Sequence, residues 1–223
     1  MQRQGLSHHF YADDSQVYLV FKPSDSQARQ DALTRVETGF EDTQTWMSNN
    51  KLKLNGDKTE AIVFTSKHNV KHTDTIQLPL GDTTVPTASS VKSLGVTFDS
   101  LMKMEQHVNS TCRSAYAQPR NIGRIRRCRT NDATKSLVNG MVSSRLDYCN
   151  ALLHGLPTSL PNKLQRVQNT AARIITRTSK YSHITPILME LHWLPIQSRV
   201  HHQILLNTFK ALHEEAPMYI TGQ

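Results

Sequence analysis

The 223-residue chain has few cysteines and no long apolar run, and both shortages limit the classes of protein to which it can belong. Its three cysteines, Cys112, Cys128 and Cys149, are odd in number, widely separated and never arranged as a CxxC pair. This pattern argues against a disulfide framework and a cysteine zinc site, and it favours a reducing, intracellular compartment. The sequence contains no run of about 18 apolar residues and no signal-peptide core near its first residues. We therefore expect a soluble protein of the nucleus or cytoplasm.

Acidic residues are scarce relative to basic ones. The sequence has 18 Asp plus Glu against 26 Lys plus Arg, which gives a formal net charge of +8. Such a balance favours a polyanionic partner such as nucleic acid, although many basic proteins bind none. The remaining composition, 37% hydrophobic and 20% charged, is ordinary for one large or two small globular domains.

The first hundred residues mix strand and helix patterns. Strand-forming residues at 8–11 and 16–21 flank a tight turn, which puts the acidic residues of this turn at a hairpin tip. Ser24 and Gln27 suggest a capping box before a helix whose apolar residues recur at helical spacing. We expect this helix to cover one face of a sheet. Further extended segments are predicted at residues 52–54, 61–64, 76–80, 83–85 and 91–98, with a hairpin turn at Gly81 and Asp82.

From about residue 104 onward the pattern is helical, so we expect a second, all-α domain to begin there. Pro119 lies inside the first helix, where it removes a backbone donor and should kink or restart the helix. Asn131 or Thr130 can cap the second helix, and Gly155 with Pro157 ends it. The expected apolar positions of the first three helices are Val108, Cys112, Ala115, Ile122 and Ile125, then Leu137, Val138, Met141, Val142, Tyr148, Cys149 and Leu152, then Leu164, Val167, Ala171 and Ile174. A fourth helix is predicted over 196–212.

The adjacent carboxylates of Asp13 and Asp14 are the main chemical signal in the chain. Two-metal phosphoryl transfer requires anionic oxygens to hold hard Mg²⁺ ions, and carboxylates at a rigid turn provide them. Because neighbouring residues of a regular strand point to opposite faces, we assign Asp13 the direct ligand role and Asp14 a supporting one. A polar hairpin turn without chemistry is the alternative interpretation of this pair alone.

Several segments in a fixed order extend this signal over nearly the whole chain. They are residues 11–18 (YADDSQVY), residues 46–60 (WMSNNKLKLNGDKTE), and residues 93–96 (SLGV) with Asp99. Together they resemble the later palm motifs, commonly called C, D and E, of LINE-type, jockey-like non-LTR retrotransposon reverse transcriptases. The resemblance continues through residues 144–153 (SRLDYCNALL), 164–169 (LQRVQN) and 191–195 (LHWLP).

The resemblance implies an α+β fold and an RNA-directed DNA polymerase. Residues 1–103 would be the C-terminal part of the palm, an antiparallel sheet with a covering helix. Residues 104–180 would form a helical thumb, and residues 181–223 a C-terminal helical extension. The implied reaction extends a DNA primer on an RNA template with deoxynucleoside triphosphates and two Mg²⁺ ions.

The resemblance also assigns roles to single residues. Asp13 and Asp14 match the metal-binding pair, and Lys58 falls where a lysine assists charge neutralisation of the triphosphate or protonates pyrophosphate. Leu94 and Gly95 match the hairpin that supports the primer end, and Tyr11 joins them as a nucleic-acid contact. A solvated turn lysine and a plain strand glycine are the alternatives for Lys58 and Gly95.

Basic residues of the expected thumb fall into two stripes when they are placed at 100° per residue. The first contains Arg113, Arg120, Arg124 and Arg127, opposite the apolar side of its helix. The second contains Lys163, Arg166, Arg173 and Arg177. Such stripes can follow a phosphate backbone without sequence preference and with salt-dependent affinity, or they can be ordinary solvated faces.

Some family features are unmatched. The family's earlier metal-binding aspartate and its glycine-containing template-binding segment have no counterpart here, so we expect this chain to be inactive alone. A non-catalytic nucleic-acid-binding remnant and a pseudogene product without a stable fold are the competing interpretations. Of the remaining candidates, His68 and His72 lack a nearby cysteine to complete a metal site, and His192 with Trp193 fits core packing better than base stacking.

Overall fold

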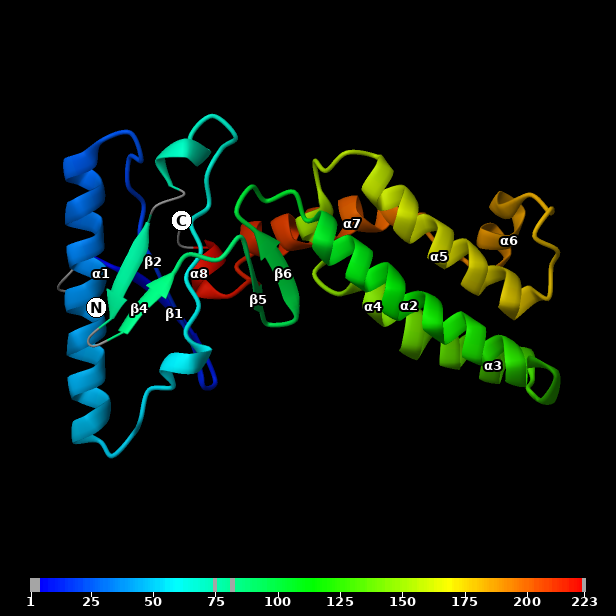
Figure 1. Ribbon diagram of the computed structural model, residues 1–223. Coiled ribbons are helices and arrows are strands. Elements are labelled where there is room, and N and C mark those ends of the chain that lie inside the picture. Colours follow the sequence, from blue (N-terminus) through cyan, green and yellow to red (C-terminus); the bar gives the residue numbers. More distant parts are fainter. Residues whose placement is uncertain (1–4, 74–75, 81–82, 222–223) are drawn as a thin grey trace. The chain divides into compact units, whose positions relative to one another are not determined.

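The computed structural model describes residues 5–73, 76–80 and 83–221, and the fold is α+β (Figure 1). The chain divides into two compact units, Met1–Met102 and Lys103–Gln223. Within the described residues, strands occur in the first unit, whereas the second is helical. The elements of the first unit are β1 (Ser7–Tyr11), β2 (Asp14–Tyr18), α1 (Ser26–Asn49), the 3₁₀ turns η2 (Gly56–Lys58) and η3 (Val70–His72), β3 (Gln77–Leu80), β4 (Thr83–Pro86), β5 (Ser90–Ser93) and β6 (Val96–Asp99).

Helix α1 confirms the helix expected after the first hairpin, but its cap differs from the prediction. The Asp25 carboxylate accepts the backbone N–H groups of Gln27 and Ala28 at 3.0 and 3.1 Å, so Asp25 rather than Ser24 is the N-cap. Leu6 packs on the buried Gly39 of this helix, where an added Cβ would lie 2.4 Å from Leu6 Cδ1. A glycine is therefore needed for the close approach of Leu6 to α1.

The strands form three separate antiparallel hairpins rather than the single sheet predicted for this region. β1 pairs with β2, β3 with β4, and β5 with β6. Two described pairs, β1–β2 and β5–β6, are each joined by a two-residue connection, so strands that are adjacent in sequence pair locally. The segments predicted to be extended at 52–54 and 61–64 belong to no named strand, and among the described residues their strand pairing is limited to an isolated bridge between Ala61 and Thr87. The predicted turn residues Gly81 and Asp82 lie outside the described residues, although Leu80 pairs with Thr83.

The prediction of one strand over residues 91–98 is also wrong. Leu94 and Gly95 both have positive φ, 46° and 83°, and they connect β5 to β6. Positive φ at both central residues is the pattern of a type I′ hairpin turn, whose twist matches that of the flanking strands. The segment therefore reverses direction at Leu94 and Gly95, with Ser93 paired to Val96.

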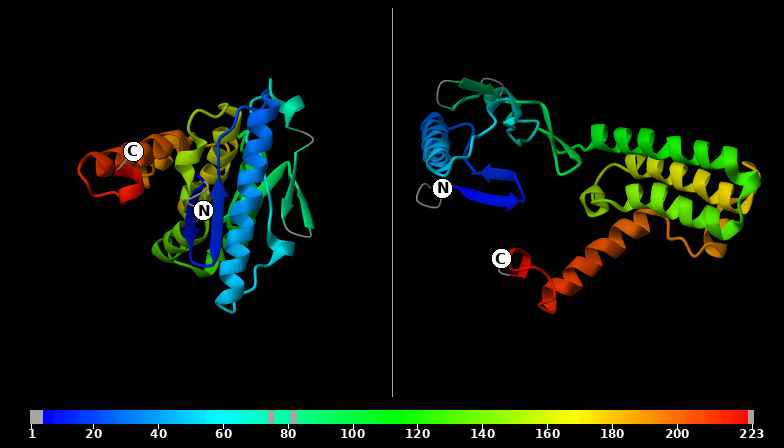
Figure 2. Two further views of the ribbon diagram at one scale, coloured as in Figure 1. Left: turned by 90° about the vertical axis from the view of Figure 1, so that its left-hand side faces the viewer. Right: turned by 90° about the horizontal axis from the view of Figure 1, so that it is seen from below.

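The second unit is built on helices that lie lengthwise against one another (Figure 2). α2 and α5 run parallel, because Lys163 near the start of α5 bonds to Asn109 near the start of α2, while Arg126 just beyond α2 reaches the end of α5. The elements are α2 (Glu105–Ile125), η4 (Arg126–Cys128), α3 (Asn131–Val138), the π-helical turn η5 (Asn139–Ser143), α4 (Ser144–Asp147), η6 (Asn150–Leu153), α5 (Ser159–Thr176), α6 (Ile184–Glu190), α7 (Ile196–Leu212) and α8 (Met218–Thr221).

The core of the second unit contains many of the predicted apolar positions. Val108, Ala115, Ile122, Val138, Val142, Leu164, Val167 and Ala171 are all buried. Ile125, Met141, Tyr148 and Leu152 are instead exposed by 39–52%, and Cys149 is exposed as well. All of these except Met141 lie at the ends of helical runs or after them, where the helical period no longer fixes which side faces the core.

The ends and the number of helices in the second unit resolve, correct or confirm the sequence-based expectations. Thr130 is the N-cap of α3, since its hydroxyl accepts the Ala133 N–H at 3.2 Å. The helical run ends at Asp147 rather than near Gly155, because Tyr148 is extended and Cys149 is left-handed with φ 51°. Pro119 is buried inside α2, which continues through it without a restart. α6 was not predicted, whereas α7 confirms the helix predicted over 196–212.

Arg126 is buried where α2, α3 and α5 meet. Its guanidinium donates to the carbonyls of Ile174 at 2.9 Å and Ile175 at 2.8 Å, and also to Arg129 O and the Asn131 side chain. These contacts satisfy carbonyls of the last turn of α5, which have no partners within their own helix. Burial, and then the neighbouring charge of Arg177, lower the pKa of Arg126 from its ordinary value.

Candidate active site and nucleic-acid interface

Asp13 and Asp14 lie at the tip of the β1–β2 hairpin. Tyr11 pairs with Asp14 as the last pair of the ladder, so Ala12 and Asp13 form the turn itself. Ala12 has a φ of 53°, which lets the chain reverse within two residues. Asp13 therefore projects from the turn and Asp14 from the first position of β2, and both are exposed.

The two aspartates are open to a ligand. Among the residues that the structure describes, neither side chain has a hydrogen-bond or ion-pair partner. The described residues also contain no group of three His, Cys, Asp or Glu side chains arranged to hold a metal. The hairpin thus offers two anionic side chains at adjacent positions, which is part of a ligand set for a hard cation.

A hydrogen bond connects the acidic hairpin to the β5–β6 hairpin. Gln16 lies two residues after Asp14 in β2, so the two side chains share one face of the hairpin. The Gln16 amide donates to the Ser93 hydroxyl, and Ser93 directly precedes the Leu94–Gly95 turn. Two segments that the sequence marked as site residues, 77 positions apart at this bond, are therefore held together.

Lys58 is not joined to this pair. It ends η2, where its backbone N–H donates to Asn55 O at 3.2 Å, and its side chain is exposed. In the described part of the chain, no hydrogen bond or ion pair connects Lys58 to Asp13 or Asp14. Tyr11 is 63% exposed beside Asp14 on the hairpin.

The first arginine stripe lies on the surface of the second unit. Arg113, Arg120 and Arg124 are exposed on α2, and Arg127 is exposed in η4. They lie opposite the buried side of α2, which contains Val108, Ala115 and Ile122. The stripe extends over about 16 Å of helix from Arg113 to Arg124.

The second stripe is largely bound internally. Lys163 bonds to Asn109 Oδ1 at 2.8 Å and lies 3.8 Å from Glu105 Oε1. Arg173 donates to Ser182 O at 3.2 Å, and its buried Nε has no partner among the described atoms. Arg166 and Arg177 are both exposed, and Arg177 also donates to Arg126 O at 3.4 Å.

Three segments that carry the resemblance in the second unit meet one another. The buried Gln168 donates to Leu194 O at 2.9 Å and accepts from Gln165, which in turn accepts the Ile196 N–H at 2.8 Å. Asp147 pairs with Arg199 at 2.6 Å. These contacts hold the start of α7 against α5 and α4. Their residues are therefore placed to position helices rather than to contact a substrate.

The interpretation of His192 and Trp193 as core residues is correct for one of them. Trp193 is half-buried against the core, with the Arg199 guanidinium 5.9 Å from its ring centroid. His192 is exposed and has a left-handed backbone with φ 55°. Its side chain faces solvent because the chain turns at this residue between α6 and α7.

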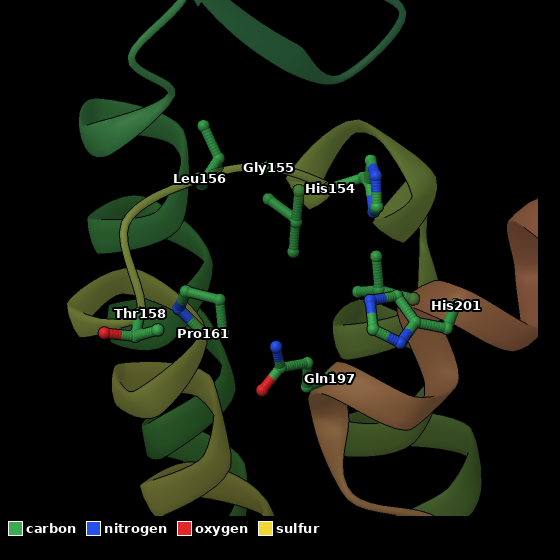
Figure 3. Close-up of a pocket in the computed structure, with 9 residues that line it drawn as sticks. His154, Gly155, Leu156, Thr158, Pro161, Gln197 and His201 are labelled. Atoms are coloured by element: carbon green, nitrogen blue, oxygen red, sulfur yellow. The ribbon is translucent and has the colours of Figure 1, made fainter.

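A small hollow lies between the segment before α5, the first turn of α5 and the start of α7 (Figure 3). His154 and His201 contribute rings whose centroids are 5.6 Å apart, and Thr158 and Gln197 add polar groups. The amino-acid sequence gives no signal for these residues, because the segment of His154 and Thr158 is far from that of Gln197 and His201 in the chain. Two imidazoles without a third ligand do not make a metal centre.

In the described part of the chain, no helix combines the length and the apolar character needed to cross a lipid bilayer. No protein-family model, curated protein or solved structure matches the chain. The case for a function therefore rests on the residues themselves and on how the fold arranges them.

Proposed function

We propose that this chain is the C-terminal palm and thumb portion of a LINE-type reverse transcriptase, an RNA-directed DNA polymerase. The observation that carries the proposal is the exposed acidic pair, Asp13 and Asp14, at the tip of a tight β-hairpin. Its bonding to the Leu94–Gly95 hairpin through Gln16 and Ser93 supports the same assignment. In this proposal residues 1–103 are the end of the palm, 104–180 the thumb and 181–223 its helical extension.

The acidic pair fits the metal that this chemistry needs. Mg²⁺ prefers anionic oxygen ligands, and the two carboxylates are exposed and adjacent. Asp13 in the turn would ligate directly and Asp14 at the strand start would support it. The complete enzyme uses two ions and a further aspartate that this chain does not match. When bound, Mg²⁺ supplies positive charge that stabilises phosphoryl transfer to a primer 3′-hydroxyl.

Other residues of the first unit fit positioning roles. The positive φ of Leu94 and Gly95, together with the absence of a side chain at Gly95, allows a primer backbone to approach the β5–β6 turn closely. The Gln16–Ser93 bond fixes this turn relative to Asp14. Lys58 would supply a positive charge, or a proton, to the leaving pyrophosphate.

The second unit supplies the nucleic-acid contacts in this proposal. Arg113, Arg120, Arg124 and Arg127 face solvent as a row of cations, and Arg166 adds an exposed cation on α5. Such contacts bind template and primer phosphates without reading sequence. Arg173 contributes less than the sequence suggested, because Ser182 O already accepts from its guanidinium.

Primer extension tests the polymerase assignment. The chain is combined with a fingers and upstream palm segment of a LINE-type reverse transcriptase, and Mg²⁺-dependent extension on RNA is measured. We expect Asp13→Asn to abolish product, and Asp14→Asn to lower the rate by roughly 10- to 100-fold, as typical for a supporting group of a metal site. Asp42→Asn, which removes an exposed carboxylate of α1, is the matched control and should extend normally.

The mixture must first give no product when the unaltered chain is omitted. The assignment fails if, in such a mixture, the Asp13→Asn and Asp42→Asn variants then give equal amounts of extended primer. RNA binding measured in a chelating buffer separates the second candidate, a non-catalytic nucleic-acid-binding protein. The exposed arginines of α2 favour that candidate, since they require no metal. Binding that survives without any extension activity would support it.

A further inference from the structure

The two basic stripes lie on neighbouring helices that run in the same direction. Lys163 bonds to Asn109 at one end of the α2–α5 pair, and Arg126 bonds to Ile174 O at the other. These two contacts fix the register between the helices along their full length. Both views of the molecule show α2 and α5 side by side (Figures 1 and 2).

Positions seven residues apart lie nearly above one another on a helix, so each helix presents a row toward the outer edge of this pair. Asn109, Tyr116 and Gly123 form the row on α2, and Lys163, Thr170 and Arg177 form the facing row from α5 to its cap. Gly123 lies beside α5, because a Cβ built on it would be in ordinary contact with Ile174 Cδ1, at 4.0 Å. The line along which these two rows meet is called the α2–α5 seam. Tyr116 is therefore level with Thr170, at the middle of this seam.

Cations flank Tyr116 on both helices. Arg113 and Arg120 lie beside it on α2, three residues before and four after, and Arg166 lies one turn before Thr170 on α5. All three arginines are exposed, and Tyr116 is 39% exposed. At the start of the helix pair, Lys163 is paired with Glu105 and donates to Asn109. The cations that a ligand can reach are therefore the arginines around Tyr116.

We propose that the α2–α5 seam binds a single-stranded polynucleotide, with Tyr116 stacking on a base while Arg113, Arg120 and Arg166 bind the flanking phosphates. An aromatic ring between cations offers both interactions that unpaired strands need, whereas the bases of a duplex are already stacked. This inference rests on the proposed function, in which these cations bind template and primer phosphates, and it names an unpaired stretch of strand as the ligand of this seam. It requires no metal and no contribution from Asp13.

Fluorescence anisotropy of labelled oligonucleotides, with the full chain in a chelating buffer, tests the inference. The probe is a mixed-sequence RNA strand, alone or annealed to its complement. We expect the single strand to bind more tightly than the duplex. Tyr116→Leu should weaken single-strand binding roughly tenfold, at the lower end of the range for one stacked base because the ring is partly covered. Tyr116→Phe should bind like the parent.

Matched controls separate stacking from general charge and from unfolding. Tyr219→Leu removes a more exposed tyrosine on α8 and should leave both affinities unchanged. Arg120→Gln should reduce the salt dependence of single-strand binding, whereas Lys210→Gln on α7 should not. Far-ultraviolet circular dichroism checks that each variant is folded.

Photo-crosslinking of the unaltered chain to the single strand gives a second measurement that needs no variant. The inference predicts a crosslinked peptide that contains Tyr116. It is overturned if crosslinks form only elsewhere, or if folded Tyr116→Leu binds the single strand like the parent. Equal losses for duplex and single strand would also overturn it. Because Asp13→Asn should leave this binding intact, loss of polymerase activity and failure of the seam are distinguishable.

Discussion

Replacing the buried Gln168 by leucine tests whether the polar contacts between α5 and the start of α7 stabilise the second unit. Gln168 is 2% exposed and makes two hydrogen bonds, one to Leu194 O at 2.9 Å and one from Gln165 Nε2 at 2.8 Å. Leucine keeps most of the volume and removes both bonds. The change therefore isolates hydrogen bonding from packing.

The expected cost follows from what remains satisfied. A buried hydrogen bond contributes a net 0.5–1.5 kcal/mol, so two bonds give about 1–3 kcal/mol. Leu194 O keeps a second donor, Arg199 Nε at 2.9 Å, so it is not left without a partner. We therefore expect a loss of about 1–2 kcal/mol, which corresponds to a fall of roughly 3–8 °C in the unfolding midpoint.

Thermal unfolding and amide hydrogen exchange measure this change. Gln168 orients Gln165, whose Oε1 accepts the Ile196 N–H at 2.8 Å, so exchange at Ile196 should accelerate. Gln197→Leu replaces an exposed glutamine of α7 and is the matched control. In a double-mutant cycle with Gln165→Leu, the combined loss should be smaller than the sum of the single losses.

An unchanged midpoint together with unchanged exchange at Ile196 would refute the reasoning. It would mean that the glutamine contacts are replaceable by apolar packing at no cost. A strictly additive double-mutant cycle would refute the bond between Gln165 and Gln168 specifically.

Two predictions concern titrating groups of the second unit. Burial lowers the pKa of His107 in the folded state from its ordinary 6.5, so the unfolded chain binds this proton more readily. The free energy of unfolding should therefore fall as pH decreases below about 6.5. The His107→Gln variant should lose that part of the pH dependence, which urea melts measure. Burial raises the pKa of the Cys112 thiol, against a smaller opposing effect of Lys163, so alkylation by iodoacetamide should be slower at Cys112 than at the exposed Cys128 and Cys149. Peptide mass spectrometry of the alkylated protein measures this order, and faster labelling of Cys112 would contradict the burial described here.

Helix prediction succeeded where the apolar period was long and undisturbed. α1, α5 and α7 follow from such periods because the face that must be buried is set by residue spacing alone. α6 spans only seven residues, too few for a period to be distinguished from chance. The strand over residues 91–98 was misread because positive φ at Leu94 is uncommon for a non-glycine residue and leaves little trace in the apolar pattern.

The candidate site divides in the same way. The hairpin tip at Asp13 could be predicted because a tight turn is a local feature of a few consecutive residues. The bond between Gln16 and Ser93 could not, since it joins positions 77 apart and depends on how two hairpins pack. The hollow at His154 and His201 also depends on packing between distant segments.

The amino-acid order by itself determined the acidic turn, the longer helices and the spacing of the arginines along α2, because each of these depends on neighbours within a few residues. Tertiary packing decided which cations remain available. Arg124 and Arg127 face water, while Arg126 between them is buried against the end of α5. Lys163 and Arg173 are bound within the protein, by Glu105 and by the Ser182 carbonyl, whereas Arg166 on α5 remains exposed. A helical period specifies an angle around one helix, but only the neighbouring helix determines whether that angle faces solvent or a carbonyl group.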